Sequence, residues 1–321
     1  MPPCGASGIM RKQKLPLIRL AKLLRDGLYR PIFLFDFLLK LLYNFNVRKR
    51  GIKSKMMNLD IYTVEMRKSI WDKAFFMDKI IGAKCIVDYG CADAQMICYL
   101  ARLFPEIEFH GYDINIALID RAVDWILFYE LPNVHVWSPK RLPNMIKQIS
   151  NKFKPDEICL NFSSVLHEVF SSTGGTDVIQ TLIKELNPKY ITIRDMYYHH
   201  EVLDEEDEYL SELQKVYIIN GISNVAPGCY NKFVAKFGTI KKMKDLVHFL
   251  MKSQWHNNGY DQELEENYFS WRIKDVRKLV KNYKVIYETH YMLPYYVEQW
   301  EKYGIEPDVH THAQFILRRD K

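Results

Sequence analysis

The sequence lacks the short motifs of several common ligand-binding classes. None of its six cysteines forms a C-x-x-C pair, which argues against a zinc site or a disulfide framework. It contains no G-x-G-x-x-G turn and no G-K-[ST], so the phosphate-binding turns of dinucleotide enzymes and P-loop proteins are excluded. The scattered cysteines predict reduced thiols and therefore a cytoplasmic protein.

Long apolar runs are also missing. The most apolar stretch, IFLFDFLLKLLY at 32–43, has about twelve residues, whereas a membrane-spanning helix needs roughly twenty. No apolar stretch precedes a small-residue cleavage site near the start of the chain, so we expect no signal peptide. The sequence therefore predicts no transmembrane segment.

Acidic residues are scarce at the beginning of the chain. Residues 1–56 hold thirteen Lys or Arg against two acids, a net charge of +11, while the whole chain carries +6. We expect residues 1–56 to form a basic arm of amphipathic helices and residues 57–321 to form a second domain. Three roles for the arm stay open: packing on the rest of the chain, binding nucleic-acid phosphates through residues 11–55, or peripheral contact with a membrane surface.

The stretch 84–115 has the pattern of a strand, a turn, a helix and a second strand. An apolar run at 85–87 ends at Asp88, and the small-residue turn 90–94 follows. Apolar residues then recur at helical spacing from Met96 to Phe104, and a strand at 108–112 ends at Asp113. Small residues let a ligand approach the backbone, and an acid at the end of the second strand suits ribose hydroxyls. Asp88 suits a ligand that carries a cationic amino group.

The residues Asp88-Tyr89-Gly90-Cys91-Ala92-Asp93-Ala94 resemble the first motif, D-x-G-C-G-x-G, of class I S-adenosylmethionine-dependent methyltransferases. Asp113 matches the acid of the second motif, whereas two glycines of the first are replaced by alanine. The resemblance extends from about residue 58 to the end of the chain. It implies an α/β fold: a Rossmann-like, seven-stranded, mostly parallel sheet with an antiparallel last strand, helices on both faces, the helical arm, and a helical insertion before strand six at about 201–282.

The resemblance also implies a binding site for S-adenosylmethionine. Asp88 and Gly90 would hold the methionine end, Asp113 the ribose and Ile114 the adenine. The full set of expected cofactor-binding residues is Asp88, Gly90, Cys91, Ala92, Asp113, Ile114, Asn115, Asn161 and Ser163.

Further strands are expected at 157–162, 190–193, 284–290 and 311–318, and a helix at 60–81 before the first strand. The segments after the strands at 157–162 and 190–193 supply the catalytic candidates His167, Glu168, Arg194 and Asp195. His167 suits a general base near neutral pH, or it orients the loop. Substrate candidates are Tyr197, His199, Trp255, His256 and Tyr295. The insertion forms either a lid or a peripheral helical bundle. We expect no metal, because the adjacent His199 and His200 point apart and no third ligand is evident.

Three functional hypotheses follow. The first, favoured here, is methyl transfer from S-adenosylmethionine to an unidentified small-molecule acceptor. The second is an RNA methyltransferase that uses the basic arm. The third is a non-catalytic subunit with a methyltransferase fold that serves as a binding partner.

Overall fold

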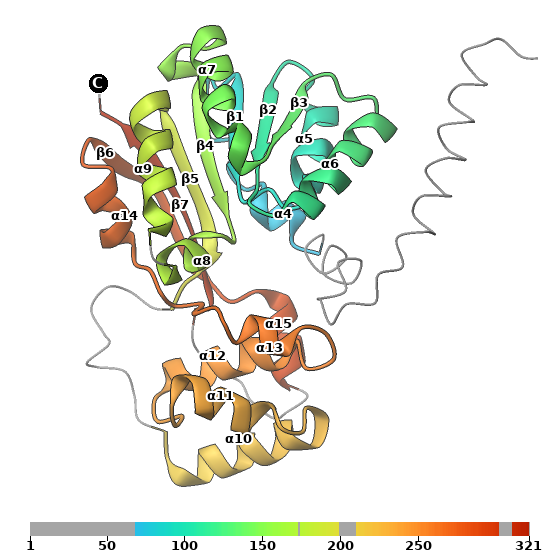
Figure 1. Cartoon of the computed structure of the whole chain (residues 1–321). Helices are drawn as coiled ribbons and strands as arrows, with labels where there is room; N and C mark the ends of the chain where they lie inside the picture. The colour runs from blue at the N-terminus through green and yellow to red at the C-terminus, as the bar shows by residue number, and fades with distance from the viewer. Residues whose placement is uncertain (1–67, 173, 199–209, 302–309, 321) are drawn as a thin grey trace, which may run out of the picture. The chain divides into compact units, whose positions relative to one another are not determined.

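A computed structural model describes residues 68–172, 174–198, 210–301 and 310–320 (Figure 1). The basic arm expected at 1–56, the first part of the helix expected at 60–81, and His199 lie outside the described residues. The account below therefore concerns the part of the chain that begins at Lys68.

Seven strands form one sheet in the order β3-β2-β1-β4-β5-β7-β6. They are β1 Cys85–Tyr89, β2 Glu108–Tyr112, β3 Val134–Trp137, β4 Ile158–Ser163, β5 Tyr190–Met196, β6 Tyr283–Tyr291 and β7 His312–Arg319. Neighbouring strands from β3 to β5 are parallel, whereas β7 runs antiparallel to both β5 and β6. The sheet confirms the predicted α/β fold with its antiparallel last strand.

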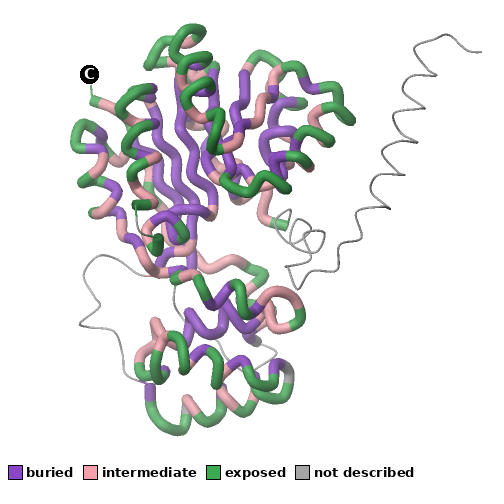
Figure 2. The backbone as a smooth tube through the Cα atoms, in the orientation of Figure 1, coloured by how far each residue is buried: buried purple, intermediate pink, exposed green. Residues whose placement is uncertain are grey.

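Helices cover both faces of the sheet because the strand side chains alternate. Val87 and Leu160 belong to the core under one face, and their neighbours Ile86 and Cys159 to the core under the other. The first face is covered by α7 Leu142–Lys152, α8 Leu166–Ser171, α9 Gly175–Leu186 and α14 Ile273–Leu279. The second is covered by α5 Gln95–Leu103 and α6 Ile116–Phe128. Figure 2 shows the resulting buried strands between exposed helix surfaces.

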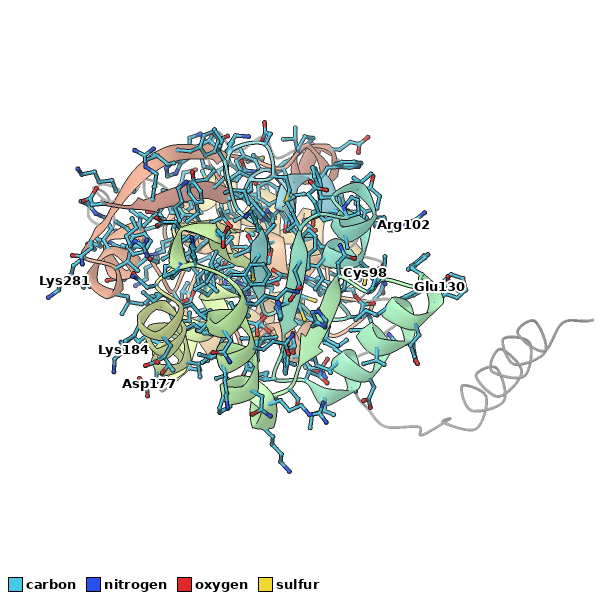
Figure 3. The ribbon with its side chains drawn as sticks, turned by 90° about the horizontal axis from the view of Figure 1, so that it is seen from above. Cys98, Arg102, Glu130, Asp177, Lys184 and Lys281 are labelled. Atoms are coloured by element: carbon cyan, nitrogen blue, oxygen red, sulfur yellow. The ribbon has the colours of Figure 1, made fainter. Side chains whose placement is uncertain are left out.

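The helices on the sheet are amphipathic, and α9 is an example. Its Ile179, Leu182 and Leu186 are buried, whereas the charged Asp177 and Lys184 are exposed and lie at the outer side of the molecule in Figure 3. Apolar residues three and four positions apart fall on one helix face, which is the face that packs on the strands.

The segment between β5 and β6 forms a third apolar cluster, separate from the two under the sheet faces. Its helices are α10 Glu212–Val225, α11 Cys229–Phe237, α12 Met243–Ser253 and α13 Tyr260–Glu263. A further helix between β6 and β7, α15 Pro294–Glu301, contributes the fully buried Trp300 to this cluster. The helical insertion was predicted, but α15 was not. None of the helices in the described part of the chain has the length and apolar character needed to cross a membrane.

Two local predictions were wrong. The expected helix at 60–81 is reduced, over its described part, to α4 Ile70–Lys73, followed by turns. Phe76 and Ile80 of these turns are buried in the core under the second face, where tertiary packing overrides helix propensity. Strand five continues past Ile193 to Met196, because β7 pairs with it as far as His312.

Candidate functional site

A cavity of about 980 Å³ opens at the carboxyl ends of the parallel strands, where ligands bind in open α/β sheets. Most of the expected site residues line it: Asp88, Gly90, Cys91, Ala92, Asp113, Ile114, Asn115, Ser163, His167, Glu168, Arg194, Trp255 and Tyr295. Further lining residues come from α4, from the helices on both faces of the sheet, from the insertion and from the start of α15. The structure thus gathers residues from the whole described chain around one space.

The turn after β1 keeps a backbone shape that favours glycine. Gly90 N and Cys91 N both donate to Tyr112 O, at 2.8 and 3.0 Å, which holds the turn against β2. Ala92 and Ala94 have φ angles of +50° and +60°, in the left-handed region that glycine adopts most readily. These are the positions at which the resembling motif has glycine, so the two alanines retain its conformation.

Replacing Gly90 by alanine should cost about 3 kcal/mol of unfolding free energy. Its φ is +78°, and an added Cβ would lie 2.6 Å from Val165 Cγ2, so left-handed strain of about 1 kcal/mol and overpacking of about 2 kcal/mol combine. Gly228 is the matched control, because its φ is +84° and a Cβ there meets nothing within 4 Å. Gly228→Ala should cost only about 1 kcal/mol. Urea unfolding measures both, and equal losses would contradict the crowding by Val165.

Asp113 is fixed at the end of β2 by backbone donors. Its Oδ1 accepts from Asn115 N and its Oδ2 from Ala92 N, both at 2.8 Å. Burial raises the pKa of Asp113, while these hydrogen bonds oppose the rise. The exposed side chain of Ile114 follows directly. A fixed carboxylate beside an exposed apolar side chain suits a ribose next to a flat ring.

Asp88 is held from behind by a chain of polar side chains. Its Oδ1 accepts from Asn161 Nδ2 at 2.7 Å, and Asn161 Oδ1 accepts from Thr192 Oγ1 at 2.7 Å. Asn161 is fully buried and lies outside the cavity wall, so it orients Asp88. Burial raises the pKa of Asp88 to about 7, with Asn161 and Lys73 acting against the rise. Burial also lowers the pKa of Lys73 to about 8.

Arg194 pairs with Asp72, a residue that the sequence analysis did not name as part of the site. Its Nε and Nη2 both lie 2.5 Å from Asp72 Oδ2. Asp72 Oδ1 also accepts from Tyr291 OH at 2.6 Å and from Gln314 Nε2 at 2.8 Å. Asp72 and Arg194 are 122 positions apart, so no spacing pattern links them. The pair anchors the segment before β1 over the cavity.

His167 and Asp195 form a buried pair. Asp195 Oδ1 accepts from His167 Nδ1 at 2.7 Å and Oδ2 from His167 N at 3.0 Å, and Asp195 itself does not reach the cavity. Burial lowers the pKa of His167, but the Asp195 carboxylate outweighs this and raises it to about 10. Since Nδ1 is directed at Asp195, the other ring nitrogen, Nε2, is the one that lies toward Glu266, with 3.5 Å between Nε2 and Oε2.

The insertion supplies cavity residues besides the substrate candidate Trp255, among them Glu263, Glu266 and Tyr268. Tyr268 OH donates to Glu263, and Lys252 Nζ lies 3.6 Å from the centre of the Tyr268 ring. The insertion loop, residues 264–272 between α13 and α14, is held against α8, because Ser270 Oγ donates to His167 O at 2.7 Å. The insertion thus contributes to the cavity wall as well as packing its own helices.

Two substrate candidates lie away from the cavity wall. Tyr197 is buried in the core, with its ring 5.0 Å from Trp271 and 5.6 Å from Phe315. His256 is outside the lining, and its Nδ1 lies 3.0 Å from Ser253 O. His199 is not among the described residues, so Trp255 and Tyr295 are the candidates that line the cavity.

No protein-family model and no curated protein matches the chain. Among solved structures, it is similar to the methyltransferase domain of bacterial CtHen1 (8% identity, 78% of this chain and 96% of that chain, TM-score 0.40). It is also similar to the plantazolicin methyltransferase BamL in complex with a triazolic desmethyl analogue and SAH (13%, 79% and 85%, 0.38). An O-methyltransferase family protein from Burkholderia thailandensis is a third (11%, 79% and 57%, 0.40).

Sequence identities of 8–13% and TM-scores of 0.38–0.40 support no conclusion about function. The strand order and the antiparallel β7 are those of the Rossmann-like methyltransferase fold that the resemblance implied. The fold is therefore established from the sheet itself, and function rests on the cavity.

Proposed function

We propose that the chain is an S-adenosylmethionine-dependent methyltransferase. The observation that supports this most is the placement of Asp88, the turn residues 90–93 and Asp113 at adjacent strand ends, all lining one cavity that His167 and Glu168 also line. A nucleoside held by Asp113 and an amino group near Asp88 then direct the rest of the ligand toward His167.

The residues present fit that cofactor. S-adenosylmethionine supplies an electrophilic methyl group on a sulfonium. Asp113 accepts the ribose hydroxyls with oxygens already fixed by Ala92 N and Asn115 N, and Ile114 packs on the adenine. Asp88, oriented by Asn161, accepts from the amino group.

The acceptor binds at the other end of the cavity, beside His167, Glu168 and the insertion loop. A volume of about 980 Å³ lies near the upper end of the usual range for ligand pockets, about 300–1,000 Å³, which leaves room for an acceptor next to the cofactor. Residues of this chain contribute mainly by holding the two reactants in line, since alignment alone lowers the barrier of a bimolecular transfer.

Cofactor affinity should rise with pH. Because burial places the pKa of Asp88 near 7, the carboxylate that pairs with an ammonium is the minority form below that pH. The ionised fraction grows from about one tenth at pH 6 to about three quarters at pH 7.5, so binding should tighten about eightfold. Calorimetry with S-adenosylhomocysteine measures the change, and Asp88→Asn should bind more weakly with no such slope. A pH-independent wild type would contradict the role of Asp88.

Calorimetric titration of the full chain with S-adenosylhomocysteine tests the proposal. We expect binding of one molecule per chain with a dissociation constant in the micromolar range, and no heat from NADH, whose pyrophosphate finds no glycine-rich turn here. Absence of binding at millimolar ligand would refute the proposed function.

A further inference from the structure

Two groups of side chains within the described residues have the donor atoms and spacing of a metal site. One consists of Glu108, His110 and His135 at the β2–β3 side of the sheet, and the other of His167, Glu168 and Glu266 at the cavity. In each group, the ligand atoms lie within 4.8 Å of one another. Their hydrogen bonds distinguish them.

In the first group the protein itself satisfies the donors. Trp137 Nε1 donates to His110 Nδ1 at 3.1 Å, so His110 carries its proton on Nε2, which lies 2.9 Å from Glu108 Oε1. The Lys152 ammonium also pairs with the Glu108 carboxylate. A cation at this place would have to displace the Lys152 ammonium as well as the Nε2 proton, so this group is a polar network that the protein already completes.

In the second group the histidine is hydrogen-bonded through Nδ1 to a carboxylate that is not one of the three ligands. Asp195 accepts the proton of His167 Nδ1 at 2.7 Å, and its other oxygen accepts from His167 N. This is the arrangement in which a carboxylate fixes a histidine ring whose remaining nitrogen binds a metal. The His167 side chain is 3% exposed, and its Nε2 lies 3.5 Å from Glu266 Oε2. The ring is therefore locked with its second nitrogen near two carboxylates, and a cation bound there would replace the proton on Nε2.

Glu266 is positioned by contacts that do not involve its own side chain. Ser270 Oγ donates to His167 O at 2.7 Å, and Asn267 N donates to Ser171 Oγ at 3.4 Å. These bonds hold the loop on α8, the helix that carries His167 and Glu168. The three donor atoms are thus brought together by two segments about one hundred residues apart, before any ligand is present.

We propose that His167 Nε2 and the carboxylates of Glu168 and Glu266 bind one divalent cation, of the Mn²⁺ or Zn²⁺ type, at the acceptor end of the cavity. One imidazole and two carboxylates are a ligand set that these ions accept, with bonds near 2.1 Å. Water or an acceptor atom fills the remaining positions, because the group faces the cavity.

Such an ion assigns a class of acceptor, and this step rests on the proposed function. The cation takes the oxygen of an acceptor hydroxyl and lowers its pKa, and the proton leaves to water in the cavity. A lone pair of that oxygen forms the new O–C bond to the methyl group, while the electrons of the broken C–S bond stay on sulfur. The structure therefore favours a hydroxyl acceptor.

Titration of the full chain with Mn²⁺ tests the site. The loss of the free-ion signal in electron paramagnetic resonance measures how much Mn²⁺ is bound. We expect one Mn²⁺ per chain, and Glu266→Gln should weaken binding about a hundredfold, at the upper end of effects seen when a metal's surroundings are altered. The matched control is Glu265→Gln, one position earlier, where the side chain is exposed and pairs with Lys236. It should bind Mn²⁺ like the wild type.

A second variant, Glu168→Gln, should lose Mn²⁺ binding as well, and thermal unfolding confirms that each variant is folded. The metal site would be overturned if the wild type bound neither Mn²⁺ nor Zn²⁺, or if the wild type and Glu266→Gln bound them equally. In that case a proton shared between His167 and Glu266 would occupy the site. Binding of S-adenosylhomocysteine separates the two proposals. If it fails while one Mn²⁺ still binds, the proposed function is wrong and the metal site stands.

Discussion

Asp113→Ala should weaken binding of S-adenosylhomocysteine by a factor of one hundred or more. In the proposed complex the carboxylate accepts two ribose hydroxyls, and hydrogen bonds to a charged group contribute about 1.5–3 kcal/mol each. Loss of about 3 kcal/mol corresponds to a factor of more than one hundred in the dissociation constant. The variant also removes the acceptor for Ala92 N and Asn115 N, which loosens the turn that the ligand contacts.

Calorimetry measures this effect, and Asp120→Ala is its control. Asp120 lies on the exposed side of α6, so its loss removes the same charge without touching the cavity. Asp113→Asn should fall between the two, because an amide keeps one acceptor oxygen. If Asp113→Ala binds as tightly as Asp120→Ala, the ribose lies elsewhere and the site has been assigned incorrectly.

Asp72→Ala should lower the unfolding free energy by about 3–5 kcal/mol, the cost of leaving a buried charge without its partner. The Arg194 side chain is 3% exposed, and Asp72 Oδ2 lies 2.5 Å from two of its nitrogens. Tyr291 and Gln314 lose an acceptor in the same variant. The segment 68–73 lines the cavity, so cofactor binding should weaken together with stability.

The control for this variant is Asp78→Ala. Asp78 also lies before β1 and pairs with Lys79, but its side chain is 79% exposed, and exposed ion pairs contribute at most about 1 kcal/mol. Urea unfolding compares the two. The double variant Asp72→Ala/Arg194→Met should recover much of the stability, because it removes the unpaired charge. Equal losses in the two single variants would show that the buried pair is not an anchor.

The parts of the fold that sequence predicted are those set by local periodicity. The apolar run before Asp88 and the helical spacing after Ala94 required only neighbouring residues, and both elements were found. The helix expected at 60–81 was wrong beyond Lys73, where the chain forms turns whose Phe76 and Ile80 pack into a core shared with strands far along the chain. Pairing with β7 extended β5 for a similar reason.

The same limit applies to the site. Asp88 and Asp113 were predicted from a motif in which each residue ends a strand, and the structure places both in the cavity wall. The position of Glu266 beside His167 depends on how the insertion loop lies on α8, and no spacing within the sequence encodes that contact. Asn161 and Asp195 were named from the strand ends, but the structure places both behind residues that face the cavity.

The most direct test of the central claim is methyl transfer itself. The full chain is incubated with S-adenosylmethionine labelled in its methyl group and with fractionated RNA, protein and small-molecule pools, and incorporation is compared with that of Asp113→Ala. We predict label in one pool with the wild type and none with the variant. Label in no pool, or equal label with both proteins, would contradict the account.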